Sequence, residues 1–222
     1  YPQFKAGGKV SDEDKREINY KIRDLFTSKI GGVIYDSADT IVISAFLGLT
    51  ALAVYQNYFY ILNAITSLIT VVFLSCTAGI GNSIVVETKE KNYRDLEKFT
   101  FIICWGTGFC SACLLCLYQP FMEIWVGKNL MLPFLMVICF VIYFFARQLN
   151  ALFNLYKDAS GMWHEDRFRP LIAALTNLAL NLILVQFIGI YGIVVSTVLA
   201  ILCVRMPGLL HNLFTVIFEK KY

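Results

Sequence analysis

Three charged side chains interrupt one long apolar stretch of the sequence, residues 25–47 (LFTSKIGGVIYDSADTIVISAFL): Lys29, Asp36 and Asp39. About 23 residues in one helix are enough to cross the hydrocarbon core of a bilayer, which is roughly 30 Å thick. Asp36 falls near the middle of the stretch. A charge at that depth costs several kcal/mol or more unless it faces protein or water. The pattern therefore predicts a carboxylate with a function.

These polar residues fall on one side of the predicted helix. At 100° per residue Lys29, Gly32, Asp36 and Thr40 share a stripe, and Asp39 lies beside it. A buried carboxylate can titrate close to neutral pH. We therefore predict that Asp36 and Asp39 bind a coupling ion, H⁺ or Na⁺, or form an electrostatic gate. The alternative is that Ser, Thr and Asn neighbours satisfy both carboxylates, or that Asp39 lies near the outer end of the span.

Composition indicates which class of protein positions these residues. The 222 residues are 58% hydrophobic and 16% charged, with a mean hydropathy of +0.63. Soluble domains carry about 25% charged residues, so the sequence predicts an integral membrane protein. The seven cysteines fall in apolar segments, which favours packing over a disulfide framework. Cys110, Cys113 and Cys116 spell CxxCxxC, but no neighbouring His or carboxylate completes a metal shell, and we expect no metal or other cofactor.

Hydropathy predicts an all-α bundle of six transmembrane helices. Residues 1–24 form a cytoplasmic segment with a short surface helix, which Ser11 and Asp14 begin as a capping box. The bundle occupies residues 25–206, and residues 207–222 form a cytoplasmic amphipathic helix lying in the interface. The predicted spans are residues 25–47, a crossing within 50–86, 99–118 (ending before Pro120), 130–156, 171–188 and 193–206, with a charged link at 89–98.

The distribution of basic residues predicts the orientation. Most of the 19 Lys and Arg residues fall in residues 1–24, the link at 89–98, the link at 157–169 and the tail, whereas the alternate links contain only Lys128. By the positive-inside rule both ends of the chain are cytoplasmic, in the cell membrane. The basic residues follow the topology and form no nucleic-acid-binding stripe, so we expect no nucleic-acid partner.

Five motifs together resemble bacterial oligosaccharide flippases of polysaccharide biosynthesis, in the MOP superfamily that also contains the MATE exporters. They are DTIVISAFLG (39–48), AGIGNSIV (78–85), LYQPFMEIWVG (117–127), DASGMWHEDRFRPLI (158–172) and FIGIYGIVVST (187–197). Members of that family contain two six-helix bundles, and this chain is similar to the second. The resemblance implies a partner bundle preceding this chain, and an activity that moves a polyprenyl-pyrophosphate-linked oligosaccharide across the membrane by alternating access.

This cargo suggests roles for further polar residues. Lys29, Arg147 and Arg205 could attract pyrophosphate or sugar acids. Snorkelling to the interface is the alternative for all three, and we favour it for Arg205. Asn57, Asn63, Asn177 and Asn181 could bind sugar hydroxyls, but hydrogen bonding between helices is the commoner role of such residues in bilayers. We retain Lys29, Arg147, Asn57 and Asn63 as candidate substrate-binding residues.

Two other functions remain open. A MATE-like, cation-coupled exporter of small molecules has the same fold class and would be favoured by an acidic, aromatic cavity. A membrane glycosyltransferase or polymerase would need a large outer loop or a cluster of carboxylates, which the short outer links do not offer. Nucleotide-binding and protease motifs are absent from the sequence, and we expect no enzymatic activity.

Overall fold

The computed structural model describes residues 11–219. Several of its helices begin or end at residues whose local chemistry favours a helix terminus. The expected cap is confirmed: the Ser11 hydroxyl accepts a hydrogen bond from the Asp14 amide at the start of the first helix. Gly161 and Gly189 end two later helices with φ angles of +69° and +57°, which favour glycine. Parts of two predicted segments, residues 1–10 and 220–222, lie outside the described residues.

The described residues form helices and contain no strand. In order the elements are α1 (Asp12–Phe46), α2 (Gly48–Val86), α3 (Lys89–Val126), a 3₁₀ turn η1 (Lys128–Leu130), α4 (Phe134–Ser160), α5 (Arg169–Ile188), α6 (Ile190–Ala200), a π-helical segment η2 (Ile201–Arg205) and α7 (Met206–Val216). The all-α prediction is confirmed.

Five helices are long and apolar enough to cross a membrane. They are α2, α3, α4, α5 and the continuous helix Ile190–Val216. Large hydrophobic side chains are exposed on their outer faces, Phe101 and Phe187 among them, as expected of a multi-pass membrane protein. The helix α1, which contains the predicted first span, is not one of the five. A sixth span therefore stays a prediction.

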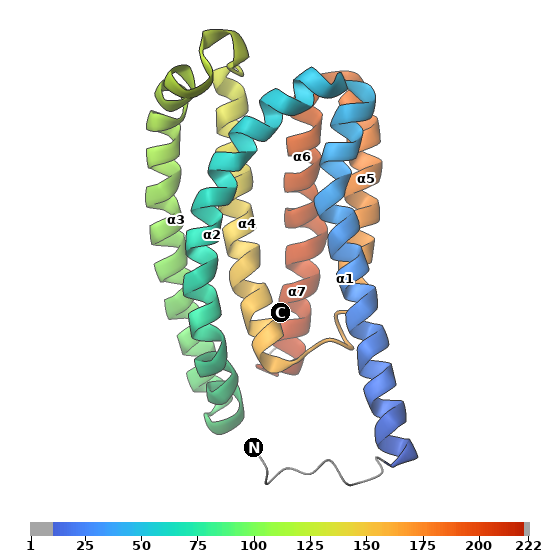
Figure 1. Cartoon of the computed structure of the whole chain (residues 1–222). Helices are drawn as coiled ribbons and strands as arrows, with labels where there is room; N and C mark the ends of the chain where they lie inside the picture. The colour runs from blue at the N-terminus through green and yellow to red at the C-terminus, as the bar shows by residue number, and fades with distance from the viewer. Residues whose placement is uncertain (1–10, 220–222) are drawn as a thin grey trace, which may run out of the picture.

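The helices associate in two sets (Figure 1). Figure 1 shows α1 beside α5 and α6, while α2 and α3 lie beside α4. Glycine allows the closest approaches in the first set. A Cβ atom at Gly31 would come within 2.5 Å of the Leu171 backbone, and one at Gly192 within 2.5 Å of the Leu184 backbone. These close approaches allow both α1 and α6 to pack tightly against α5.

Three predicted boundaries differ from the structure. The charged link at 89–98 is the start of α3, because Thr88 caps the helix by accepting a hydrogen bond from the Lys91 amide. The same helix continues through Pro120 to Val126. The N-terminal surface helix is not separate from the first predicted span, because α1 is continuous over both.

The predicted tail helix is also continuous with the preceding segment. No break occurs at Pro207, which lies directly after the π-helical segment η2 in a helix that is continuous from Ile190 to Val216. Leu209 and Leu213 of α7 are fully buried in an apolar cluster with Leu152 of α4. The apolar face of this segment thus packs against the bundle, and its interfacial position stays a prediction.

Candidate functional site

A polar cavity lies among α1, α2, α4 and η2. It has a volume of about 350 Å³, and its polar lining residues are Asp36, Thr70, Thr77, Arg147, Asn150, Asn154, Asp158 and Arg205. Most of the remaining lining side chains are apolar. The cavity therefore collects polar groups from helices that are otherwise apolar enough to lie in a membrane.

Two arginines supply positive charge to this cavity. Arg147 of α4 donates hydrogen bonds from Nη1 to Asn63 Oδ1 (3.0 Å) and to the Tyr143 hydroxyl (3.2 Å). The guanidinium carbon of Arg205 lies 4.4 Å from the centre of the Tyr35 ring. Within residues 11–219, neither guanidinium has a carboxylate oxygen within 4.0 Å. The partners of both guanidinium groups are neutral side chains, so neither positive charge is neutralised and both can attract an anion.

Two buried polar atoms at the cavity lack hydrogen-bond partners in the described structure. They are Arg205 Nε, a donor, and Asn150 Oδ1, an acceptor. An unsatisfied buried polar group costs about 1–3 kcal/mol, so such groups mark positions where water or a ligand binds. Both atoms belong to residues that line the cavity.

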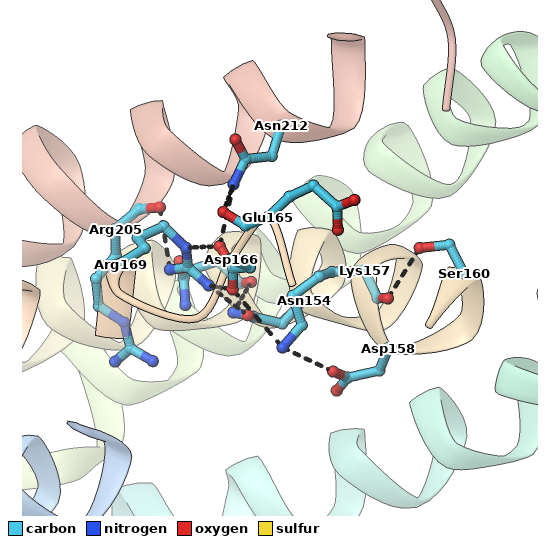
Figure 2. A network of polar contacts seen from close by, with 10 residues as sticks. Asn154, Lys157, Asp158, Ser160, Glu165, Asp166, Arg169, Arg205 and Asn212 are labelled. Atoms are coloured by element: carbon cyan, nitrogen blue, oxygen red, sulfur yellow. Dashed lines mark hydrogen bonds and ion pairs between the residues drawn. The ribbon is translucent and has the colours of Figure 1, made fainter. Parts of the chain in front are cut away.

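A buried ion pair fixes the cavity wall from the side of the α4–α5 loop (Figure 2). Arg169 makes a bidentate pair with Asp166 through Nε and Nη2, the latter at 2.6 Å. The same guanidinium donates to Asn154 Oδ1 (3.2 Å) and to the backbone carbonyl of Arg205 (3.3 Å). Asn212 of α7 donates to Asp166 Oδ1 at 3.3 Å. This group of residues, the loop clamp, joins α4, α5, η2 and α7.

A second polar group surrounds Asp39 at the interface of α1, α5 and α6. Asn181 Nδ2 lies 2.8 Å from Asp39 Oδ1, and Thr197 Oγ1 lies 3.0 Å from Asp39 Oδ2. Asn177 donates to Thr197 Oγ1 at 2.9 Å, and Ser196 donates to Asn181 Oδ1. The side chains around Asp39 are almost completely buried: Asn177, Asn181, Ser196 and Thr197.

The Asp39 site accommodates both the charged and the neutral carboxyl. Thr197 has one hydroxyl proton and two acceptors in reach, Asp39 and the Ile193 carbonyl at 3.0 Å. When Asp39 is ionised, Thr197 donates to it. When Asp39 is protonated, the carboxyl can donate to Thr197, which then donates to Ile193. The carboxylate, hydroxyl and amide oxygens are also of the type that bind a hard cation.

The α4–α5 loop is tied to α1 through Asp24. His164 Nδ1 lies 2.7 Å from Asp24 Oδ2, and Arg167 Nη1 lies 3.4 Å from Oδ1. Burial by itself would raise the pKa of Asp24. The hydrogen bond with His164 and the charge of Arg167 outweigh burial, and hold the pKa below its ordinary value of 3.8.

The residues predicted from the sequence fall in four places. Asp36 and Arg147 line the cavity, and Asn63 holds Arg147. Asn57 lines a neighbouring pocket with Asn63. Asp39 lies in the separate buried group, and the exposed Lys29 is 6.0 Å from the Trp163 ring, away from the cavity.

Several cavity residues were missed or given another role. Asn150, Asn154 and Asp158 follow Arg147 at intervals of three or four residues on α4, a spacing that would have identified them. Arg205 was expected to snorkel, yet it lines the cavity because η2 changes the helical phase. No sequence signal marks that π-helical segment.

Comparisons with protein-family models, with curated proteins and with solved structures found no match to this chain. The resemblance to oligosaccharide flippases therefore stays a prediction.

Proposed function

We propose that this chain is one bundle of a transporter that moves a polyprenyl-pyrophosphate-linked oligosaccharide across the cell membrane by alternating access. The observation that carries the proposal is the cavity containing Arg147 and Arg205, two cations without carboxylate partners among apolar helices. Arginine binds phosphate through several N–H groups at once, and the attraction is stronger where water is scarce. A pyrophosphate-linked sugar is a cargo of suitable charge.

In this proposal α1 is the sixth span. Its charged residues lower its hydropathy, but Asp36 faces the cavity and Asp39 is hydrogen bonded within the bundle, so neither needs to face lipid. The clusters of Lys and Arg support a cytoplasmic position for both ends of the described chain. A second bundle would close the other side of the cavity, as in transporters that rock two halves about a central site.

Asp39 is the proposed site of ion coupling. Its carboxylate is surrounded by the Thr197 hydroxyl and the Asn177 and Asn181 amides. H⁺ and Na⁺ are both compatible with this set of groups. Transport driven by a pH gradient without Na⁺ would select H⁺. A requirement for Na⁺ at constant pH would select the metal ion.

One observation favours a second candidate. Asp36 lines the cavity without a Lys or Arg nitrogen within 4.0 Å among the described residues, and an unpaired carboxylate attracts organic cations. A MATE-like exporter of small cationic molecules would use it in this way. Of the two carboxylates that line the cavity, Asp158 pairs with Lys157 at 2.9 Å. The cavity therefore has two arginines without a carboxylate partner and one unpaired carboxylate, and this balance makes the anionic cargo the first choice.

The test is depletion of the complete protein in its host, followed by measurement of lipid-linked oligosaccharide in each leaflet. Accumulation on the cytoplasmic side with loss of surface polysaccharide is expected, and re-expression of the wild-type protein must reverse both. Unchanged lipid-linked sugar together with new sensitivity to cationic drugs would refute the flippase and favour the exporter.

A further inference from the structure

A groove between α2 and α3 changes from polar to apolar along its length. Its polar mouth, about 280 Å³, is lined by Gln56, Asn57, Tyr60, Asn63 and Trp125. A second hollow, about 270 Å³ and apolar, shares Tyr60 and Trp125 with the mouth. A third, about 290 Å³, shares Phe121 and two isoleucines with the second. The three hollows share lining residues, so they follow one another along α2 and α3 and are together called the groove.

The polar mouth adjoins the arginine cavity. Asn63 lines the mouth, and Arg147 lines the arginine cavity. The hydrogen bond from Arg147 to Asn63 connects the two. The Tyr60 and Trp125 rings, with centres 6.0 Å apart, stand between the mouth and the apolar part of the groove. A molecule lying across this boundary would meet amides and a guanidinium at one end and hydrocarbon at the other.

The apolar part is long and opens outward. It follows α3 from Trp125 to Phe109, 16 residues or about 24 Å at 1.5 Å per residue, which is most of the ~30 Å hydrocarbon core. Phe109 and Leu117 line it while 64% and 62% of their surfaces stay exposed. These dimensions suit one long hydrocarbon chain entering from the bilayer.

We propose that this groove holds the polyprenyl chain of the lipid-linked oligosaccharide while the head group lies at the mouth and in the cavity. The inference rests on the proposed function and adds the path of the lipid tail. The amides of Gln56, Asn57 and Asn63 match the hydroxyl groups of a sugar, and Arg147 matches the pyrophosphate.

The test uses the complete protein in lipid nanodiscs and a polyprenyl pyrophosphate with a photoreactive diazirine in its chain. Irradiation and mass spectrometry are expected to find adducts on peptides of α2 and α3 that contain groove residues. Ala64→Trp fills the apolar part, and should reduce these adducts about tenfold by steric exclusion. Ala112→Trp is the matched control, since Ala112 is an exposed alanine of α3 outside the groove lining, and should leave the adducts unchanged.

Three results would overturn the inference: adducts concentrated on other helices, displacement of the probe by excess phosphatidylglycerol, or equal labelling of the Ala64→Trp variant. A reconstituted assay of oligosaccharide flipping separates the two proposals. If Ala64→Trp flips oligosaccharide at the wild-type rate, the groove is not the path of the lipid tail, and the proposed transport function is unaffected. Groove labelling in a wild-type protein that moves no oligosaccharide would reject the transporter and support a polyprenyl-lipid site.

Discussion

Asp36 and Asp39 lie one helical turn apart on α1 but face different parts of the bundle. Asp36 lines the arginine cavity, whereas Asp39 accepts hydrogen bonds from Asn181 and Thr197 at the interface with α5 and α6. One carboxylate is thus available to a cargo, and the other is held inside a hydrogen-bonded group. Their substitutions should affect different properties of the protein.

Neutralising Asp36 should impair transport and leave the fold intact. The Asp36 side chain is exposed to the cavity and pairs with no described Lys or Arg, so Asp36→Asn should change the free energy of unfolding by less than about 0.5 kcal/mol. Transport by the complete protein, measured at equal membrane levels, should fall. Wild-type rates would contradict a role for this carboxylate.

Removing the Asp39 carboxylate should destabilise the bundle as well. Asp39→Ala removes one acceptor from the buried Asn181 amide, at a cost of about 1–3 kcal/mol, and leaves the Thr197 hydroxyl with the Ile193 carbonyl as its acceptor. Unfolding in a titration with sodium dodecyl sulfate would measure this loss. Asp36→Ala is the matched control on the same helix. Equal stability of the two variants would argue against the hydrogen-bonded group around Asp39.

Arg147 should determine the charge of the transported molecule. Arg147→Gln removes the cation, and should reduce binding of a pyrophosphate-linked sugar about tenfold, the loss expected for one charge-assisted interaction of ~1.4 kcal/mol. Arg147→Lys keeps the charge, so it should recover part of the binding. Binding is measured by titration of the purified complete protein. Stronger binding of cationic drugs by Arg147→Gln, with unchanged sugar binding, would instead favour the exporter.

The loop clamp should be the most sensitive polar group in the bundle. Asp166 and Arg169 are both buried, and breaking a buried pair by removing one partner costs about 3–5 kcal/mol. Asp166→Asn should therefore lower the free energy of unfolding by about that amount. Glu123→Gln, which breaks the exposed pair with Lys128, should cost less than about 1 kcal/mol. Similar losses in the two variants would show that the clamp does not stabilise the fold.

The tie between Asp24 and the α4–α5 loop should weaken in acid. The pKa of Asp24 is lowered in the folded protein by the His164 hydrogen bond and the Arg167 charge. Its contribution to stability is therefore complete above the unfolded pKa of 3.8, and is lost as the pH falls through the lower folded value. Asp24→Asn should remove this acid-dependent part of the unfolding curve. An identical pH dependence in the variant would exclude Asp24 as its source.

Local patterns predicted much of the architecture. The Ser11 cap and the apolar runs of α2 to α6 follow from short-range chemistry that is visible in sequence. The link at 89–98 was wrong because charged residues also form good helices. Most residues of this segment are exposed, as their charge suggests, although Asn92 and Leu96 are buried. The backbone of the segment is helical.

The site was harder to predict because it depends on packing between distant segments. Charge inside an apolar stretch was sufficient to select Asp36 and Arg147, which line one cavity. Lys29 satisfied the same criterion but lies elsewhere, since a helical wheel does not tell which face meets a neighbouring helix. Asn177 and Asn181 were assigned to contacts between helices; in the structure Asn181 donates to Asp39 and Asn177 donates to Thr197.

The π-helical segment η2 accommodates one extra residue without rotating the helix that follows it. A π turn contains one residue more than an α turn, so Ile201–Arg205 completes its turn with one residue beyond the α-helical number. If the same residues formed regular α-helix, the chain from Met206 onward would be rotated by about 100° relative to α6. Leu209 and Leu213, which are buried against the bundle, would then face another direction. Deletion of one residue within η2 should therefore preserve the packing of α7, whereas deletion of one residue at the start of α7 should disrupt it.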